Sequence, residues 1–430
     1  MDIKLIMTLS LIYIGLLFVY FNLFIFLLEE KKKKKIFKEY PKVSIIVPAY
    51  NEEKNIEKAI KSLLELDYPK DRLEIIVVDD GSKDKTYEIA KKFESDIVKV
   101  YKKENGGKAS ALNYGIKKAT GELIVTLDAD SVVPKDALKK MLEYFDEEDV
   151  MIVVPSIQVE NTDGWVAKVQ IIEYAYNNVL RKIFDKLNSI YVAPGPFSVF
   201  RRELFDKIGY FDEKNLTEDM EIAMRTQAYG YKIRHCPDVV VRTKVPTDLK
   251  SLIRQRLRWY LGFVENFSVY KDKIGNKILV DLIFGSAILF VITPIISLSI
   301  FLYDFFKPIY DNILYYYYID FNIIPLIKYS IYNFSKFFDE LYFQYLAGGL
   351  FLLFFSVVLT GIFIYFLKKY WEIDKSNSRS EKVISFIFYS WLYLLLYATF
   401  WIVVFYYKIF GKELRWGGIV WRNSLINKWK

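Results

Sequence analysis

Hydrophobic and polar residues alternate in blocks along residues 43–160. Short, largely apolar runs such as residues 43–49 and 73–78 are typical of strands that are buried on both faces. Between them lie segments such as residues 52–66 and 108–119, in which apolar residues recur at helical spacing. Strands and helices that alternate in this way predict an α/β domain, with a mostly parallel sheet that carries helices on both faces.

Four longer segments are apolar and contain no charged residue: Leu5–Leu28, Leu282–Tyr303, Leu341–Leu367 and Val383–Tyr407. Each is long enough to cross a bilayer as an α-helix. The run Lys31–Lys35 directly follows the first segment, and basic residues next to a span favour the cytoplasmic side of the membrane. We therefore expect a multi-pass plasma-membrane protein whose central domain is cytoplasmic.

The predicted organisation has five parts. They are an N-terminal transmembrane anchor (1–28), a cytoplasmic domain (29–245), an interfacial amphipathic helix (246–276), a C-terminal transmembrane region (277–408) and a basic tail (409–430). The number of C-terminal spans stays open. Three spans place the basic tail outside the cell. A fourth span or a re-entrant segment over residues 312–332 places the tail inside again, but it leaves the basic loop 368–382 on the wrong side of the membrane.

The chain has a single histidine, His235, and a single cysteine, Cys236. A zinc site built from several such residues and an intramolecular disulfide are therefore excluded. Nothing around His235 resembles the turn that carries the nucleophile of a serine hydrolase. Proton transfer and metal binding must therefore rely mainly on carboxylates.

Polar and acidic turns follow three of the predicted strands. They are Tyr50–Asn51–Glu52, Asp79–Asp80–Gly81 and Asp128–Ala129–Asp130. Because ligands of open α/β sheets bind at the carboxyl ends of the strands, we expect the three turns to line one crevice. Asp128 and Asp130 suit Mg²⁺ or Mn²⁺ bound together with a diphosphate, and Asp80 suits a nucleobase or a ribose. The alternative is that these residues form ordinary solvated turns.

Two further segments carry candidate chemistry. Gly106 and Gly107 precede Lys108 at a predicted helix start, which is typical of an anion site but also of an ordinary loop-to-helix junction. Glu218 and Asp219 begin another predicted helix, where acidic residues are common because they cap the helix. Helix capping is the first interpretation of these two residues. Since the chain offers no other credible base, the second is that one of the two carboxylates deprotonates a sugar hydroxyl.

Seven motifs occur in a fixed order between residues 47 and 259. They read VPAYNEE, VVDDGSKD, NGGKASALN, TLDADS, GPFSVFRR, TEDMEIAMR and QRLRW. In this order and at this spacing, the chain resembles the membrane-integrated family 2 glycosyltransferases. That group includes the cellulose, chitin, hyaluronan and bacterial poly-N-acetylglucosamine synthases.

The resemblance implies a GT-A fold, Mg²⁺ or Mn²⁺ as cofactor, and an inverting transfer from a UDP-sugar, most simply UDP-N-acetylglucosamine or UDP-glucose. It implies a glycan or lipid acceptor and membrane lipids as partners, and no nucleic acid. The implied nucleotide-sugar contacts are Asp79, Asp80, Lys108, Asp128 and Arg258, and the implied metal ligands are Asp128 and Asp130. Asp219 is implied as the general base with Glu218 beside it, and Glu218, Gln255 and Trp259 as the acceptor-binding residues.

Arg254 and Arg256 lie outside the QxxRW signature that Gln255, Arg258 and Trp259 form. We expect both arginines to face lipid headgroups. The favoured function is a processive synthase that extends, and exports, a β-linked polysaccharide. The alternatives are a membrane enzyme that adds one sugar to a lipid, and a non-catalytic subunit that binds a glycan.

Overall fold

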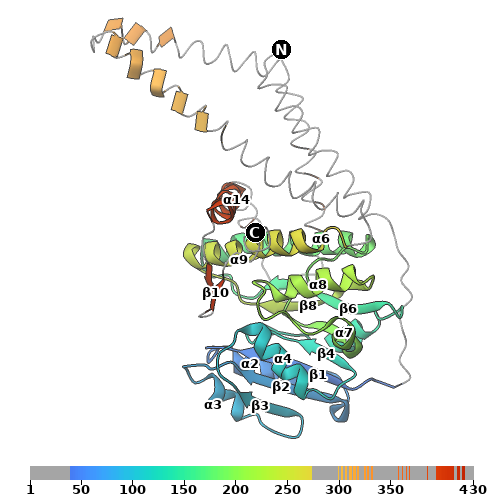
Figure 1. Cartoon of the computed structure of the whole chain (residues 1–430). Helices are drawn as coiled ribbons and strands as arrows, with labels where there is room; N and C mark the ends of the chain where they lie inside the picture. Colours follow the sequence, from blue (N-terminus) through green and yellow to red (C-terminus); the bar gives the residue numbers. More distant parts are fainter. Residues whose placement is uncertain are drawn as a thin grey trace. The chain divides into compact units, whose positions relative to one another are not determined.

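The computed structural model describes residues 39–273, 394–410, 414–416 and 419–421, together with scattered residues between 299 and 385 (Figure 1). The chain forms two compact units, one of Met1–Phe21 with Ser286–Glu372 and the other of Asn22–Gly285 with Ile373–Lys430. All the helices and strands named below belong to the second unit.

The central sheet has eight strands in the order β3-β2-β1-β4-β7-β6-β8-β5. The strands of its first half are β1 (Val43–Ala49), β2 (Leu73–Asp79), β3 (Val98–Lys102) and β4 (Leu123–Thr126). β1 pairs in parallel with both β2 and β4, and β2 pairs in parallel with β3. Every residue of β1 is buried, as expected for a parallel strand that is covered on both faces.

The second half of the sheet is mixed. Its strands are β5 (Ser131–Val132), β6 (Val150–Val159), β7 (Ser198–Arg201) and β8 (Lys232–Thr243). β7 runs antiparallel to both β4 and β6, and β5 runs antiparallel to β8, whereas β6 and β8 are parallel. The predicted α/β class with a mostly parallel sheet is therefore confirmed. In the middle of this sheet, the short strand β7 runs opposite to its two neighbours.

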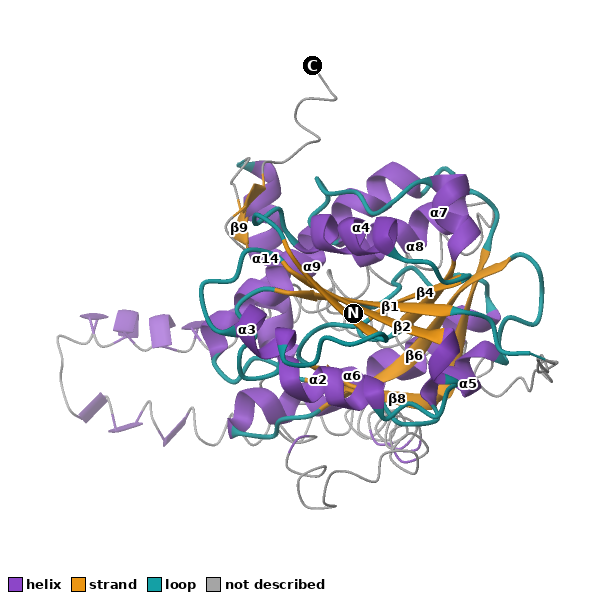
Figure 2. Ribbon diagram, turned by 90° about the horizontal axis from the view of Figure 1, so that it is seen from below, coloured by secondary structure: helices purple, strands orange, loops and turns teal. Residues whose placement is uncertain are grey.

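Helices cover both faces of the sheet, as predicted (Figure 2). One face packs against α2 (Ile56–Leu64), α3 (Thr86–Lys91) and α5 (Ala137–Leu142), and the other against α4 (Lys108–Lys118), α7 (Arg202–Ile208) and α8 (Glu218–Ala228). Because neighbouring side chains of a strand point to opposite faces, Ile45 and Val47 of β1 enter the first core and Ile46 enters the second.

Three further helices pack together: α6 (Gly164–Lys186), α9 (Leu249–Tyr270) and α14 (Leu394–Ile409). Val169 of α6, Leu252 of α9 and Phe400 of α14 share one apolar cluster. The rings of Tyr260 and Trp401 stack with their centroids 4.8 Å apart. A short antiparallel pair, β9 (Leu414–Trp416) and β10 (Ile419–Trp421), follows α14. The helix expected within residues 246–276 is thus present as α9.

The predicted membrane segment Leu5–Leu28 lies outside the described residues, and so do most of Leu282–Tyr303 and Leu341–Leu367. Val383–Tyr407 is described only in part, mainly as α14. Among the helices that the structure describes, none is both long and apolar enough to cross a membrane. The division of the chain into membrane and cytoplasmic parts therefore stays a prediction.

β1 and β4 separate at the point where the candidate site begins. β4 pairs with β1 only from Val43 to Ile46, and Pro48, which has no N–H group to donate to a neighbouring strand, follows two residues later. β2 and β3 lie on one side of β1 and β4 lies on the other, so the order of the strands reverses between β1 and β4. In α/β sheets, ligands bind in the crevice at the carboxyl ends of the strands at such a switch point.

Candidate active site

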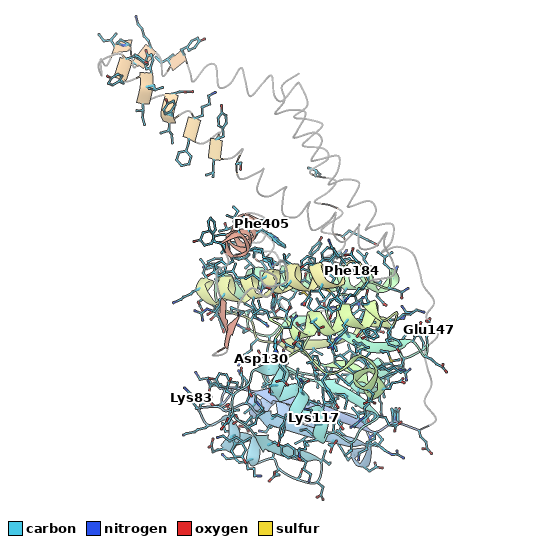
Figure 3. All side chains as sticks on the ribbon, viewed as in Figure 1. Lys83, Lys117, Asp130, Glu147, Phe184 and Phe405 are labelled. Carbon is cyan, nitrogen blue, oxygen red and sulfur yellow. The ribbon has the colours of Figure 1, made fainter. Side chains whose placement is uncertain are left out.

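The three predicted turns lie along one edge of the sheet, because β1, β2 and β4 are parallel. Asp130, in the turn after β4, lies between the N-terminal strands and the layer of α6 and α9 (Figure 3). Asp128 of the same turn pairs with Lys108, the first residue of α4, with 2.5 Å between Nζ and Oδ1. Lys108 Nζ also lies 3.5 Å from Glu218 Oε1. A single lysine therefore links the β4 turn to the start of α8.

Asp219 follows Glu218 in the first turn of α8. Burial raises the pKa of the Asp219 carboxyl to about 6, and the adjacent Glu218 carboxylate adds to this rise. Lys108 and Arg258 act in the opposite direction. A carboxyl group with such a pKa is largely ionised at neutral pH and is a stronger base than an ordinary aspartate. This combination suits a general base.

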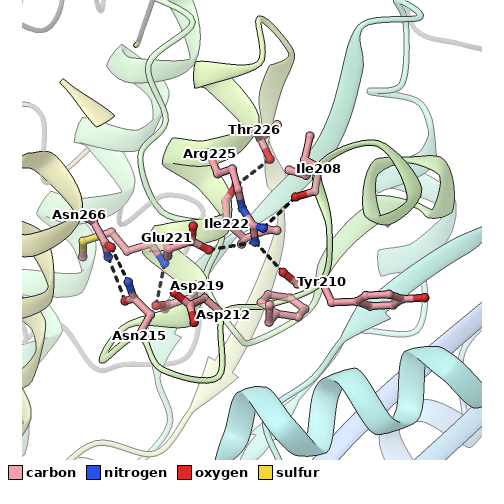
Figure 4. A network of polar contacts seen from close by, with 12 residues as sticks. Ile208, Tyr210, Asp212, Asn215, Asp219, Glu221, Ile222, Arg225, Thr226 and Asn266 are labelled. Atoms are coloured by element: carbon pink, nitrogen blue, oxygen red, sulfur yellow. Dashed lines mark hydrogen bonds and ion pairs between the residues drawn. The ribbon is translucent and has the colours of Figure 1, made fainter. Parts of the chain in front are cut away.

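Polar contacts hold α8 at both of its ends (Figure 4). Asn215 Nδ2 donates to Asn266 Oδ1 at 2.7 Å, and Asn266 Nδ2 donates back to Asn215 Oδ1 at 3.2 Å. Asn266 Nδ2 also donates to Thr217 Oγ1 at 3.0 Å. Towards the other end, Arg225 Nη1 donates to the carbonyl of Ile208 at 2.8 Å. The contacts of Asn266 fix the first turn of α8, which a base of defined position requires, and the contact of Arg225 fixes its last turn.

Asp80 is buried, and its carboxylate organises the loop that precedes α4. It accepts hydrogen bonds from the backbone N–H groups of Gly106 at 3.1 Å and Gly107 at 2.8 Å, and from Lys103 Nζ at 2.7 Å. Gly107 has a φ of 89°, a conformation that favours glycine, and it leads directly into Lys108. Asp80 therefore shapes the loop that presents Lys108, and its contact with a nucleobase stays a prediction.

Asp79, the last residue of β2, is fully buried. Its Oδ2 accepts a hydrogen bond from the Ser82 N–H at 3.3 Å and lies 3.9 Å from Lys102 Nζ. Its Oδ1 has no hydrogen-bond partner within the part of the chain that the structure describes. Since an unsatisfied buried acceptor is costly, this oxygen fits the N–H donor of a bound ligand.

Asp130 accepts hydrogen bonds at Oδ1 from Ser131 Oγ at 3.0 Å and from Thr243 Oγ1 at 3.2 Å. Burial raises the pKa of the Asp130 carboxyl, and the neighbouring Asp128 raises it further. Burial also raises the pKa of Glu52, in the turn after β1, and Asp130 and Asp128 contribute to that rise. Carboxylates that repel one another in this way fit a divalent cation.

The described residues contain no group of three or more histidine, cysteine, aspartate or glutamate side chains arranged to hold a metal ion. Mg²⁺ commonly binds through only one or two carboxylates and takes its other ligands from water and substrate phosphates. Asp128 and Asp130 match this pattern, so the predicted metal ligands fit a cation that arrives with a diphosphate.

α9 carries Gln255, Arg258 and Trp259 past the start of α8. Arg258 Nη1 donates to the carbonyl of Leu216 at 3.3 Å. Further along α9, Gly262 lies against Thr217, and a Cβ atom added to this glycine would lie 2.5 Å from Thr217 Cγ2. The two helices thus approach more closely than any larger residue permits, which brings Arg258 near the predicted base.

The expectation for Arg256 is wrong, because its side chain is fully buried and does not face lipid headgroups. It makes an ion pair with Glu173 of α6, in which Arg256 Nε donates to Glu173 Oε1 at 2.9 Å. A charged side chain is tolerated in the interior when it is paired and hydrogen-bonded in this way. Arg254 is exposed, and its contact with lipid stays a prediction.

Sequence reasoning missed two residues at this site, and it placed a third, Glu52, in a turn along the crevice without giving it a role. A Cβ atom on Gly195 would lie 2.5 Å from Asp128 Oδ1, so only glycine leaves room for the Asp128–Lys108 pair. Tyr174 of α6 has a pKa that burial raises, and Asp128 and Asp130 are among the charges acting on it. Gly195 and Glu52 lie within the GPFSVFRR and VPAYNEE motifs, which could have indicated them, whereas no motif surrounds Tyr174.

Residues 44–209 match the family described as Glycosyl transferase family 2. The chain is 30% identical over 410 residues to the probable glycosyltransferase YdaM of Bacillus subtilis, a match that covers 90% of this chain and 88% of that protein. It is 32% identical over 253 residues to the poly-beta-1,6-N-acetyl-D-glucosamine synthase of Staphylococcus aureus, which covers 58% of this chain and 61% of that protein.

A solved structure extends the comparison to the fold. It is the mannosyltransferase PcManGT from Pyrobaculum calidifontis in complex with GDP-Man and Mn²⁺. The TM-score is 0.58 and the sequence identity 21%, and the match covers 90% of this chain and 97% of that one. The likeness confirms the predicted GT-A-like arrangement of the sheet and its helices.

Proposed function

Because this chain belongs to family 2 of the glycosyltransferases, we propose that it transfers a sugar from a UDP-sugar to an acceptor hydroxyl, with inversion at the anomeric carbon. The proposed donor is UDP-N-acetylglucosamine, since one relative is named a poly-beta-1,6-N-acetyl-D-glucosamine synthase. UDP-glucose is the alternative donor.

The observation that carries this proposal is the chain of charges from Asp128 through Lys108 to Glu218 and Asp219. It joins a strand end suited to a nucleotide diphosphate to a carboxylate suited to deprotonation. In the proposed reaction, Asp219 accepts the proton of the acceptor hydroxyl while that oxygen attacks the anomeric carbon. The bond from this carbon to the diphosphate breaks, and UDP leaves without a covalent enzyme intermediate.

A divalent cation and two basic side chains are proposed to stabilise the negative charge of the leaving diphosphate. Asp128 and Asp130 would hold Mg²⁺ or Mn²⁺, which supplies Lewis-acid stabilisation of the departing phosphate when it is bound. Arg258 offers a guanidinium group, whose planar fork matches phosphate oxygens. Lys108 exchanges part of its contact with Asp128 for the diphosphate when the donor binds.

The proposed acceptor is the end of a growing β-linked polysaccharide, with Gln255 and Trp259 as its contacts. The indole of Trp259 is only half-buried, which suits stacking against a sugar ring. The long apolar segments favour a plasma-membrane location and export of the product. A lipid acceptor is the alternative. A non-catalytic subunit is disfavoured because the proposed base and metal ligands are all present.

The test is an assay of the full-length protein, purified in detergent, with Mn²⁺ or Mg²⁺ and a panel of sugar nucleotides. UDP release and product size are scored together. A ladder of products from UDP-N-acetylglucosamine supports a polysaccharide synthase, and a single glycolipid supports the alternative acceptor. Absence of turnover with every UDP-sugar would contradict the proposed reaction.

The acceptor assignment has its own variant. Trp259→Ala removes the proposed stacking surface but leaves the donor site in place, so chain extension should fall by about tenfold or more while hydrolysis of the UDP-sugar changes little. Equal losses of extension and hydrolysis would argue against an acceptor role for Trp259.

A further inference from the structure

The side chain of Arg256 lies at the centre of a buried polar cluster between α6 and α9. Glu173 accepts from its guanidinium group through both carboxylate oxygens. Gln170, one turn earlier on α6, accepts from Arg256 Nη2 at 3.0 Å. Gln170 Nε2 in turn donates to the carbonyl of Pro246 at 2.9 Å, just ahead of α9. The cluster therefore fixes α9 against α6 through several directional contacts.

The same guanidinium group contacts two side chains of the QxxRW signature. Its central carbon lies 4.0 Å from the centroid of the Trp259 ring, in a cation–π arrangement. Its Nη1 donates to Gln255 Oε1. One buried residue thus touches both proposed acceptor contacts, and its own orientation is set from α6 by Glu173.

We infer that Arg256 is a positioning residue for the acceptor: held by Glu173, it fixes the indole of Trp259 and the amide of Gln255 in the orientation that receives the sugar. The inference rests on the proposed function, because it takes Gln255 and Trp259 as acceptor contacts. An arginine is needed here because only its planar fork can engage a carboxylate edge-on while its face stacks on an aromatic ring.

A contribution to stability alone explains the buried pair of Arg256 and Glu173 less well. A buried ion pair between charged side chains is often no more stabilising than well-packed apolar residues of similar size. Its directional geometry, in contrast, has a consequence for the acceptor, since a small displacement of a binding group can lower a rate by about two orders of magnitude. If Arg256 positions the acceptor contacts, its substitution should lower transfer specifically and not merely lower the stability of the protein.

The experiment compares transfer with hydrolysis in the full-length protein. UDP-N-acetylglucosamine is the donor and a short β-1,6-linked N-acetylglucosamine oligosaccharide is the acceptor probe. Arg256→Lys keeps the charge but loses the fork and the stacking. We expect it to raise the KM for the oligosaccharide, or lower the transfer rate, by about tenfold or more, while hydrolysis of the donor stays within about twofold.

Glu173→Gln is the second variant, in case Arg256→Lys folds poorly. It keeps the size of the side chain but replaces one acceptor oxygen with an amide NH2 group and removes the charge that orients the guanidinium group, so the same selective loss should appear in milder form. Arg234→Lys is the matched control, because Arg234 is also a buried arginine in a cluster of carboxylates, with Asp185 3.6 Å away, but contacts none of the acceptor residues. It should lower Tm without changing the ratio of transfer to hydrolysis.

The outcomes separate the two ideas. If Trp259→Ala lowers transfer selectively but Arg256→Lys and Glu173→Gln lose transfer and hydrolysis together, as a purely structural pair would, the positioning role is overturned and the acceptor assignment stands. If Trp259→Ala shows no selective loss, the acceptor assignment fails and the positioning role fails with it. Selective loss in all three variants, against an unchanged ratio in Arg234→Lys, supports both.

Discussion

At Asp219, burial and the adjacent Glu218 carboxylate work against ionisation, whereas Lys108 and Arg258 favour it. The balance places the pKa at about 6. Because a base acts only when it is ionised, kcat/KM should fall on the acid side of about pH 6. Glu218→Gln removes the like charge and should move this acid limb to lower pH. The measurement is a pH–rate profile of both proteins, and coinciding limbs would contradict the coupling.

The same pKa has an opposite consequence for stability. Since the folded protein raises the pKa of Asp219 above its ordinary value, the stabilisation linked to this group is present below about pH 4 and is lost as the pH rises through about 6. Asp219→Asn should therefore raise Tm at neutral pH and have little effect below pH 4. Thermal melts over this range test the prediction, with the exposed Asp206→Asn on α7 as control. A difference in Tm that does not depend on pH would argue against it.

Asp130 provides the residue-scale test of the metal. Its carboxylate is half-buried and lies near that of Asp128, so a divalent cation should relieve their repulsion. We expect Mn²⁺ with UDP to raise Tm of the native protein and to lose this effect in Asp130→Asn. The exposed Asp163→Asn should behave like the native protein. An equal shift in Asp130→Asn would remove Asp130 as a ligand.

At the scale of elements, the contact between α8 and α9 depends on one glycine. Gly262→Ala places a methyl group against Thr217, so the helices must separate and Arg258 must move away from Asp219. Transfer should fall by about tenfold or more. Ser268→Ala, at an exposed position further along α9, should leave transfer unchanged. Native activity in Gly262→Ala would show that this close approach is dispensable.

Local patterns predicted most elements of the sheet but not all of their neighbours. The apolar runs at β1 and β2 and the helical spacing at α2 and α4 all appear where expected. The antiparallel insertion of β7 between β4 and β6 was not predicted. Strand pairing depends on contacts between residues distant in the chain, which the period of a single segment does not encode.

The candidate site shows the same limit at the scale of the whole molecule. Parallel strands and their carboxyl ends predicted that Asp79, Asp80 and Asp128 share one edge, and the structure places them there. The position of Arg256 could not be predicted from its neighbours in α9, because its counterion Glu173 lies 83 residues away in the sequence. A charged residue on a helix is therefore expected at the surface unless a buried counterion is known.

In the proposed reaction, the donor binds at the edge of β1, β2 and β4 and the acceptor binds beside α8 and α9, with Asp219 between them. Because Asp219 is not a proposed nucleotide contact, a substitution of Asp219 should abolish transfer without weakening donor binding.

The most direct measurement follows transfer from UDP-N-acetylglucosamine by the native protein and by Asp219→Asn, with donor affinity measured in parallel. We expect the native protein to release UDP and form a β-linked product, and we expect Asp219→Asn to bind the donor with nearly unchanged Kd and form no product. Transfer by Asp219→Asn at the native rate would contradict the assignment of the general base.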